Sequence, residues 1–81
     1  MRKWLEEMMT TLRENMFVGE SIRKRQIPAY YVKKFGVNNL FRYHLPGGFR
    51  AVYTLVREGN DVSVVVLEVL DHKNYDNRFG Y

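Results

Sequence analysis

The hydrophobic pattern changes its period near residue 38, and this change limits the folds open to the chain. Before it, large apolar residues recur at spacings of three to four, which is typical of one face of an amphipathic helix. After it, apolar and polar residues alternate between turns rich in glycine and proline, as in β-strands. Helices followed by strands predict an α+β domain, with N-terminal helices packed on one face of a small antiparallel β-meander.

The helical half has three expected pieces. An amphipathic helix carries Trp4 to Met16 and ends before Gly19. A short helical or irregular piece holds Arg23-Lys24-Arg25, and Pro28 limits it because the residue before a proline avoids the α region. One more short helical segment is expected over Ala29–Phe35, before Gly36.

The second half predicts three strands. Val62 to Leu70 is apolar on both alternating sets of positions, so we expect it to be a central strand buried on both faces. The other strands and the turns follow from the same alternation and from glycine placement: strands Asn39–Leu45 and Phe49–Arg57, turns Pro46–Gly48 and Glu58–Asp61.

Length and composition indicate one small domain over residues 1–81. There is no cysteine, so neither a disulfide framework nor a thiolate zinc site can support it. No apolar run reaches the ~18 residues of a transmembrane span, and Glu6 and Glu7 do not suit a signal peptide. The expectation is a soluble, cytoplasmic protein with no membrane partner.

The basic charge lies in the first half of the chain. Residues 1–37 hold eight Lys or Arg against four Glu, whereas residues 38–81 hold five against five acidic residues. The excess comes mainly from Arg23-Lys24-Arg25 and Lys33-Lys34. One-sided basic charge is an electrostatic footprint for a polyanion such as nucleic acid, although many basic domains bind nothing acidic.

Two arginines of the predicted hairpin are candidate phosphate ligands. Arg42 and His44 share one face of their strand, and Arg50 alternates with Val52 and Thr54 in the next. An arginine among apolar positions can present a planar fork to a phosphate. The structural alternative for Arg50 is a cross-strand ion pair with Glu68 or a position on the solvated surface.

The C-terminal ten residues are rich in aromatic and titratable groups. The imidazole of His72 and the phenols of Tyr75 and Tyr81 are groups that can transfer protons. The alternative is structural, with Phe79 anchoring the segment and the tyrosine rings packed. Two histidines without cysteine show no recognisable metal-ligand spacing, so neither a metal nor a cofactor is expected.

Several segments resemble the RelE/ParE superfamily of toxins, over roughly residues 15 to 81. In the hairpin, a strand containing an arginine, a turn, and an aromatic–arginine–x–x–tyrosine pattern recur in this family. The end of the chain and the segment ahead of the sheet resemble its RelE-like branch. The segments are Asn39–Tyr53, Leu67-Glu68, His72–Tyr75, Phe79–Tyr81 and Ile27–Gly36.

The resemblance implies a toxin of a type II toxin–antitoxin system that acts as a ribosome-dependent mRNA endonuclease, an mRNA interferase. Such enzymes inhibit translation by metal-free attack of a 2′-hydroxyl on the adjacent phosphate. It implies Arg50 as the phosphate clamp, His72 as general base or acid, and Tyr81 as its proton partner or a base-stacking ring. Its RNA-binding residues would be Arg23, Arg25, Lys33, Lys34, Arg42 and Lys73.

The resemblance also implies partners, namely a cognate antitoxin, the ribosome and mRNA. Family members open with a strand that this chain lacks, so a sheet edge is expected to be open to an antitoxin segment or to a second copy in a homodimer. Two other functions remain open. The chain could be a RelE-fold binding module without catalytic activity, or a ParE-like inhibitor of DNA gyrase.

Overall fold

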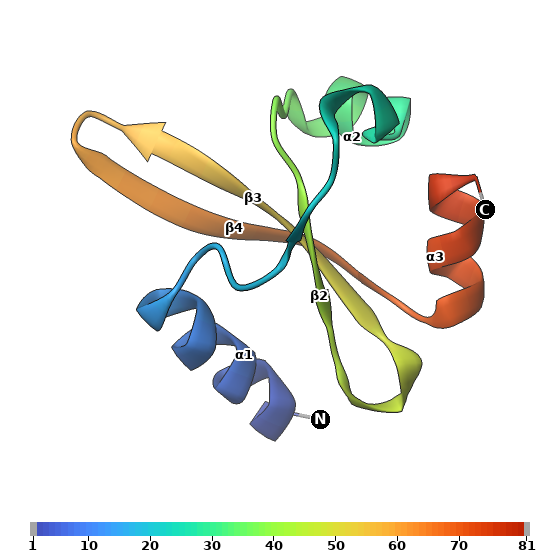
Figure 1. Cartoon of the computed structure of the whole chain (residues 1–81), viewed down its shortest axis with the longest axis horizontal. Helices are drawn as coiled ribbons and strands as arrows, with labels where there is room; N and C mark the ends of the chain where they lie inside the picture. The colour runs from blue at the N-terminus through green and yellow to red at the C-terminus, as the bar shows by residue number, and fades with distance from the viewer. Residues whose placement is uncertain (1, 81) are drawn as a thin grey trace.

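The computed structural model describes residues 2–80, and these form a small α+β fold of three α-helices and one four-stranded antiparallel sheet. The helices lie around the sheet at separate places (Figure 1). The strand order is β1-β2-β3-β4, so each strand pairs with its neighbour in sequence. The elements are α1 Arg2–Glu14, β1 Glu20–Ser21, η1 Lys24–Gln26 (a 3₁₀ turn), α2 Ala29–Phe35, β2 Phe41–His44, η2 Pro46–Gly48 (a second 3₁₀ turn), β3 Arg50–Glu58, β4 Asp61–Leu70 and α3 His72–Phe79.

The meander has a fourth, very short strand that the alternation did not predict. β1 has two residues and pairs with β2 through Glu20↔Arg42 and Ser21↔Phe41. Two residues are too few to show a hydrophobic period. This short strand nevertheless brings Glu20 alongside β2, on the face that carries Arg42.

The prediction of a buried central strand over Val62–Leu70 is wrong. This segment forms β4 at the edge of the sheet, and Val62, Val65 and Val69 are each more than a third exposed. β3 takes the central place, with Ala51, Val52 and Tyr53 fully buried. An uninterrupted apolar run does not distinguish a central strand from an edge strand that has helices against parts of both faces.

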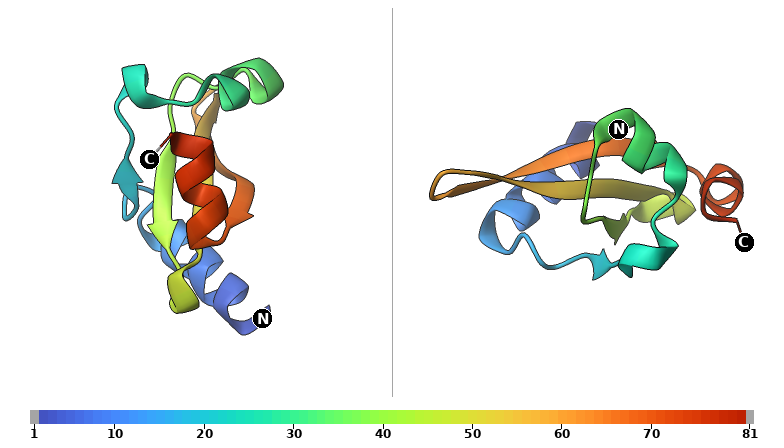
Figure 2. Two further views of the ribbon diagram at one scale, coloured as in Figure 1. Left: turned by 90° about the vertical axis from the view of Figure 1, so that its right-hand side faces the viewer. Right: turned by 90° about the horizontal axis from the view of Figure 1, so that it is seen from above.

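The helices cover both faces of the sheet, not one face as the sequence suggested. Met8 and Leu12 of α1 pack against Phe41, Ala51 and Tyr53 on one face. On the opposite face, a second cluster joins α2 and α3 to the sheet, and Figure 2 shows the three helices spread around the strands. Because β3 carries apolar side chains at both alternating sets of positions, each face needs its own cover. The second cluster comprises Ile22, Tyr31, Leu40, Val52, Leu70 and Tyr75.

A β-bulge interrupts the pairing of β3 with β4. Val52 pairs with Glu68, but the next residue, Tyr53, pairs with Val66, so Leu67 is the extra residue. Leu67 and Leu70 therefore contact the cluster beneath α2 and α3, whereas Val66 contacts the cluster beneath α1. The bulge thus sets the face on which β4 ends and α3 begins.

The residues after β4 form a helix. Asp71 caps it, because its Oδ1 accepts a hydrogen bond of 2.8 Å from the backbone N–H of Asn74. Gly80 ends it in the left-handed region at φ 76°. Phe79 stacks on Tyr75 with ring centroids 4.4 Å apart, and it also meets Tyr31 of α2. Across residues 2–80, no helix has both the length and the apolar character needed to cross a membrane.

Candidate functional site

Arg50 and His72 meet at the end of the sheet. Arg50 opens β3, directly opposite Leu70 at the end of β4, and His72 opens α3 two residues later. The Arg50 Nη1 atom lies 3.3 Å from the Nδ1 atom of His72. The imidazole is 69% exposed, so this pair of a fixed cation and a titratable ring is open to a ligand.

Two further contacts orient the Arg50 guanidinium. Its Nη1 donates a hydrogen bond of 3.0 Å to the carbonyl oxygen of Gly48 in the β2–β3 turn. Its Cζ atom lies 5.0 Å from the centroid of the Tyr75 ring, which is within cation–π range. Tyr75 itself is buried at 2% exposure. A buried ring below and a turn carbonyl beside it therefore hold the guanidinium in place.

A second arginine is fixed by the same tyrosine. Arg42 Nη1 donates to the Tyr75 hydroxyl at 2.7 Å, and its Nη2 donates to Glu20 Oε2 at 3.0 Å. The other carboxylate oxygen of Glu20, Oε1, lies 2.8 Å from His44 Nε2. The hydrogen bonds from Arg42 and then His44 lower the pKa of the Glu20 carboxyl below its usual value. Glu20 is therefore an anionic bridge between Arg42 and His44.

His44 lies on β2, the neighbour of β3 on the side away from β4. It pairs directly with Arg50 across β2 and β3, and residues opposite each other in an antiparallel pair have Cβ atoms about 4.5–5.5 Å apart. The His44 side chain is 59% exposed. On α3, Asp76 Oδ2 lies 3.3 Å from His72 Nε2. We call the whole set the histidine–arginine cluster: Glu20, Arg42, His44, Arg50, His72, Tyr75 and Asp76.

The predicted site residues divide into three groups. Arg50, His72 and Arg42 lie in the histidine–arginine cluster, and Tyr81 lies outside the described residues. The alternative ion pair of Arg50 with Glu68 is wrong, because Glu68 pairs with Arg78 at 3.2 Å. The remaining predicted RNA-binding residues are exposed on η1, α2 and α3 or beside them: Arg23, Arg25, Lys33, Lys34 and Lys73.

The site predicted from the sequence left out four members of the cluster, namely Glu20, His44, Tyr75 and Asp76. The tight turn at Pro46–Gly48 pairs His44 with Arg50, so counting back across the turn would have found His44. Asp71 is a good N-cap residue and would have placed Asp76 one turn after His72. No sequence signal marks Glu20, because a two-residue strand leaves no pattern.

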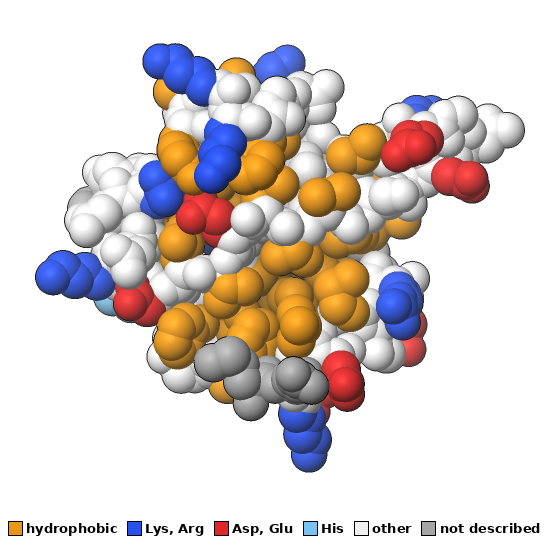
Figure 3. All heavy atoms as spheres, turned by 180° about the vertical axis from the view of Figure 1, so that it is seen from behind, with side chains coloured by type: hydrophobic (Ala, Val, Ile, Leu, Met, Phe, Trp, Pro, Cys, Tyr) orange, Lys and Arg blue, Asp and Glu red, His pale blue; other side chains and the backbone are white. Residues whose placement is uncertain are grey.

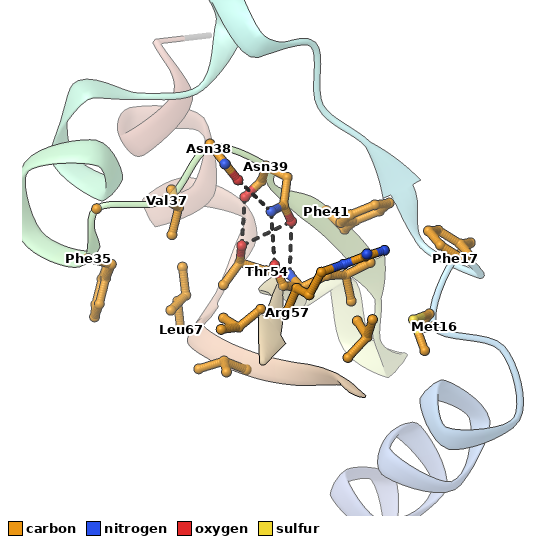
Figure 4. Close-up of a pocket in the computed structure, with 15 residues that line it drawn as sticks. Met16, Phe17, Phe35, Val37, Asn38, Asn39, Phe41, Thr54, Arg57 and Leu67 are labelled. Atoms are coloured by element: carbon orange, nitrogen blue, oxygen red, sulfur yellow. Dashed lines mark hydrogen bonds between the residues drawn. The ribbon is translucent and has the colours of Figure 1, made fainter. Parts of the chain in front are cut away.

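A hollow lined mainly by apolar side chains lies elsewhere. Phe17, Phe35, Val56 and Val65 line it between α2 and the β3–β4 hairpin, and Arg57 is its only titratable residue. Figure 3 shows extended apolar surface on the side of the molecule that it views, and Figure 4 shows Asn39 bonded to β3 at the edge of the hollow. A surface of this composition suits a binding partner better than acid–base chemistry.

Comparisons with protein-family models, curated proteins and solved structures find no match. Within residues 2–80, no three His, Cys, Asp or Glu side chains are grouped as metal ligands would be. The histidine–arginine cluster is the candidate site among the described residues. It combines two guanidinium groups, two exposed imidazoles and two carboxylates on one face of the sheet.

Proposed function

We propose that this chain is the toxin of a type II toxin–antitoxin system, a RelE-like endoribonuclease that cleaves mRNA in the ribosome through attack of a 2′-hydroxyl on the adjacent phosphate. The observation that carries the proposal is the contact of 3.3 Å between Arg50 and His72 at an open end of the sheet. Cleavage of this kind needs a cation at the phosphate and a titratable group beside it.

Arg50 suits the role of phosphate clamp. Its guanidinium is always charged and offers planar, paired donors that match two phosphate oxygens. The Gly48 carbonyl and the Tyr75 ring hold the group before a ligand arrives, so little conformational freedom is lost on binding. As charge develops on the phosphorane oxygens, a fixed guanidinium stabilises it without having to reorient.

His72 suits proton transfer because it is exposed and lies beside the clamp. An imidazole has two ring nitrogens, one of which can accept a proton while the other donates one. Asp76 contacts the opposite ring nitrogen and orients the ring. We assign no role to Tyr75 beyond support, since its hydroxyl accepts a hydrogen bond from Arg42 and its ring is buried. The proposal keeps Tyr81 as a partner or stacking residue.

Exposed basic residues supply the proposed contacts with the RNA backbone. Arg42 lies inside the cluster and Lys73 follows His72 on α3. Phosphate contacts of this kind hold RNA largely by charge. The remaining proposed contacts come from η1 and α2: Arg23, Arg25, Lys33 and Lys34.

The proposed protein partner is a cognate antitoxin. The apolar hollow and the exposed Phe17, at 65% exposure, support a surface that another chain covers. The outer edge of β2 is paired with only two residues of β1, and β4 forms the other edge. Either edge offers backbone groups to a strand of the antitoxin or of a second copy.

Toeprinting in a translation extract tests the nuclease. We expect the wild-type protein to cut mRNA in the ribosomal A site, and Arg50→Ala and His72→Ala each to lower the rate about 10²–10⁴-fold. Arg13→Ala is the matched control, because it removes an exposed cation from α1, which packs on the other face. Circular dichroism and thermal unfolding of each variant establish that the fold is intact.

Folded wild-type protein that leaves mRNA uncut would contradict the nuclease. Equal loss in Arg13→Ala would contradict the assignment of the site, because general loss of charge would then explain the effect. In the first case, a DNA supercoiling assay with gyrase distinguishes a ParE-like inhibitor from a binding module. A binding module would leave both reactions unaffected.

A further inference from the structure

Two histidine–carboxylate pairs stand on either side of Arg50. His72 lies between Arg50 and Asp76, with Nδ1 toward the guanidinium and Nε2 toward the carboxylate. His44 faces Arg50 across the strand pair, and its Nε2 contacts Glu20. A phosphate held by Arg50 would therefore lie between β2, which carries His44, and α3, which carries His72. The environments of the two imidazoles differ, and the difference indicates which proton each one carries.

The contacts of His72 indicate the neutral ring with a lone pair on Nδ1. A guanidinium has only N–H donors and no acceptor, so Nδ1 of His72 must accept the hydrogen bond from Arg50 at 3.3 Å. The ring proton is then on Nε2, where it is donated to Asp76 Oδ2 at 3.3 Å. When a phosphate binds Arg50, the guanidinium turns its donors to the phosphate, and the lone pair on Nδ1 of His72 becomes available. A neutral imidazole with a released lone pair is a base.

The contacts of His44 suit the opposite role. Its neighbour Glu20 is an anion, whose carboxyl pKa is lowered first by the hydrogen bond from Arg42. An adjacent carboxylate favours the charged imidazolium, and the contact between His44 Nε2 and Glu20 Oε1 is short at 2.8 Å. The Nδ1 atom, across the ring from this contact, can then carry a transferable proton. An imidazolium held in this way is an acid.

We propose that His44 is the general acid of the site, positioned by Glu20, and that His72 is the general base, positioned by Asp76. This assignment rests on the proposed function. His72 Nδ1 takes the proton of the 2′-hydroxyl, and the 2′-oxygen forms a bond to phosphorus. The bond from phosphorus to the 5′-oxygen breaks, and His44 gives that oxygen a proton. The products are a 2′,3′-cyclic phosphate and a 5′-hydroxyl, and solvent exchange restores both rings.

The other titratable groups around the cluster are less suited to either role. Both oxygens of Glu20 are engaged, one by Arg42 and one by His44. The Tyr75 hydroxyl accepts from Arg42, and its ring is buried. The charged groups that face His44 are Glu20 and Arg50, and those that face His72 are Arg50 and Asp76.

A sulfur leaving group tests the assignment of the acid. In an mRNA with a 5′-bridging phosphorothiolate in the A-site codon, the leaving group is a thiolate, which needs no proton from the enzyme. On ordinary mRNA, His44→Ala and His72→Ala should each lower cleavage about 10²–10⁴-fold. On the thiolate substrate, His44→Ala should recover to within about tenfold of wild type, whereas His72→Ala should stay low. His44→Gln retains a polar group that can donate to Glu20 and is the second variant if the alanine variant misfolds.

Glu20→Gln tests the positioning role separately. A neutral amide no longer favours the imidazolium, so the alkaline limb of the pH–rate profile should move to lower pH. A purely structural role would lower the rate equally at every pH. Arg42 keeps its bond to Tyr75 in this variant, which limits other changes at the site.

The outcomes separate the two proposals. If wild-type protein cleaves mRNA but both His44 variants cleave at the wild-type rate, His44 is not the acid and the nuclease proposal stands. Rescue of His72→Ala instead of His44→Ala would reverse the two roles and overturn the assignment. If folded wild-type protein does not cleave either substrate, the proposed function itself fails and this inference fails with it.

Discussion

Tyr53 fixes the loop that leads into the candidate site. It is fully buried, and its hydroxyl donates to the Met16 carbonyl at 2.8 Å and accepts from the Gly19 N–H at 3.1 Å. The approach at Gly19 is so close that an added Cβ would lie 2.6 Å from the Tyr53 oxygen and 2.7 Å from the Arg42 carbonyl oxygen. Since Glu20 follows directly, one hydroxyl helps to set the position of the carboxylate.

Tyr53→Phe should therefore destabilise the fold without changing its shape. Two partly buried backbone groups lose their partner, which is expected to cost about 1–3 kcal/mol in the free energy of unfolding. Urea unfolding measures the change. Tyr43→Phe removes the same atom from a half-buried ring that packs against the same cluster, and it should change stability by only about 0.5 kcal/mol. Equal effects in the two variants would contradict the importance of the Tyr53 hydrogen bonds.

At the scale of elements, α3 depends on a single cap and on contacts with its neighbours. Asp71 bonds the N–H of Asn74, and Arg78 reaches back to Glu68 on β4 at 3.2 Å. The Arg78 guanidinium also lies 3.7 Å from the centroid of the Tyr30 ring on α2. A helix of eight residues is too short to be stable alone, so the position of His72 follows from this cap and these contacts.

Asp71→Ala should loosen α3 and reduce activity together. Loss of an N-cap costs about 0.5–2 kcal/mol, and hydrogen exchange of residues 72–79 should become faster than in the rest of the chain. Asp71→Asn is the control, because asparagine also caps helices well. Uniformly faster exchange across the sheet as well would show that the cap supports the whole fold and not this element.

Part of this organisation was predictable from the sequence. Hydrophobic period and turn residues identified α1, α2, β3 and the tight turn before Arg50 close to their observed ends, because these signals are local. The meander order of the three longer strands was also predicted, whereas β1, the edge position of β4 and the two covered faces were not, since they depend on long-range pairing. Arg50 and His72 were candidates from their chemistry, and the family resemblance assigned their roles. Glu20 could be placed in the cluster only from the pairing of β1 with β2.

The whole molecule is held by two apolar clusters, one on each sheet face, and each contains a buried tyrosine. Tyr53 belongs to the cluster beneath α1, and burial raises its pKa above 10.0. Tyr31 belongs to the other cluster, where burial and then the Glu68 carboxylate raise the pKa of its hydroxyl further. Both halves of the core therefore favour neutral phenols.

This arrangement predicts loss of stability in alkali. In the unfolded chain these tyrosines ionise near pH 10, while in the folded chain they keep their protons. Above that pH the folded state binds more protons than the unfolded state, so stability falls as pH rises, by up to about 1.4 kcal/mol per pH unit for each tyrosine. Urea unfolding between about pH 8 and pH 11 measures this slope. Tyr31→Phe should flatten the slope, and an unchanged slope would contradict the role of Tyr31.

The bulge at Leu67 determines which face of the sheet the last residues of β4 occupy. Side chains alternate along a strand, so one extra residue exchanges the faces of everything that follows it. Residues removed in pairs from the β3–β4 hairpin tip would leave the register between Arg50 and Leu70 as it is. Removing Leu67 alone would turn the end of β4 over and direct α3, with His72, toward the face that α1 occupies. The β3–β4 hairpin tip should therefore tolerate insertions or deletions made in pairs. The number of residues between the bulge and His72 should not change, because the chemistry proposed for His72 depends on its position.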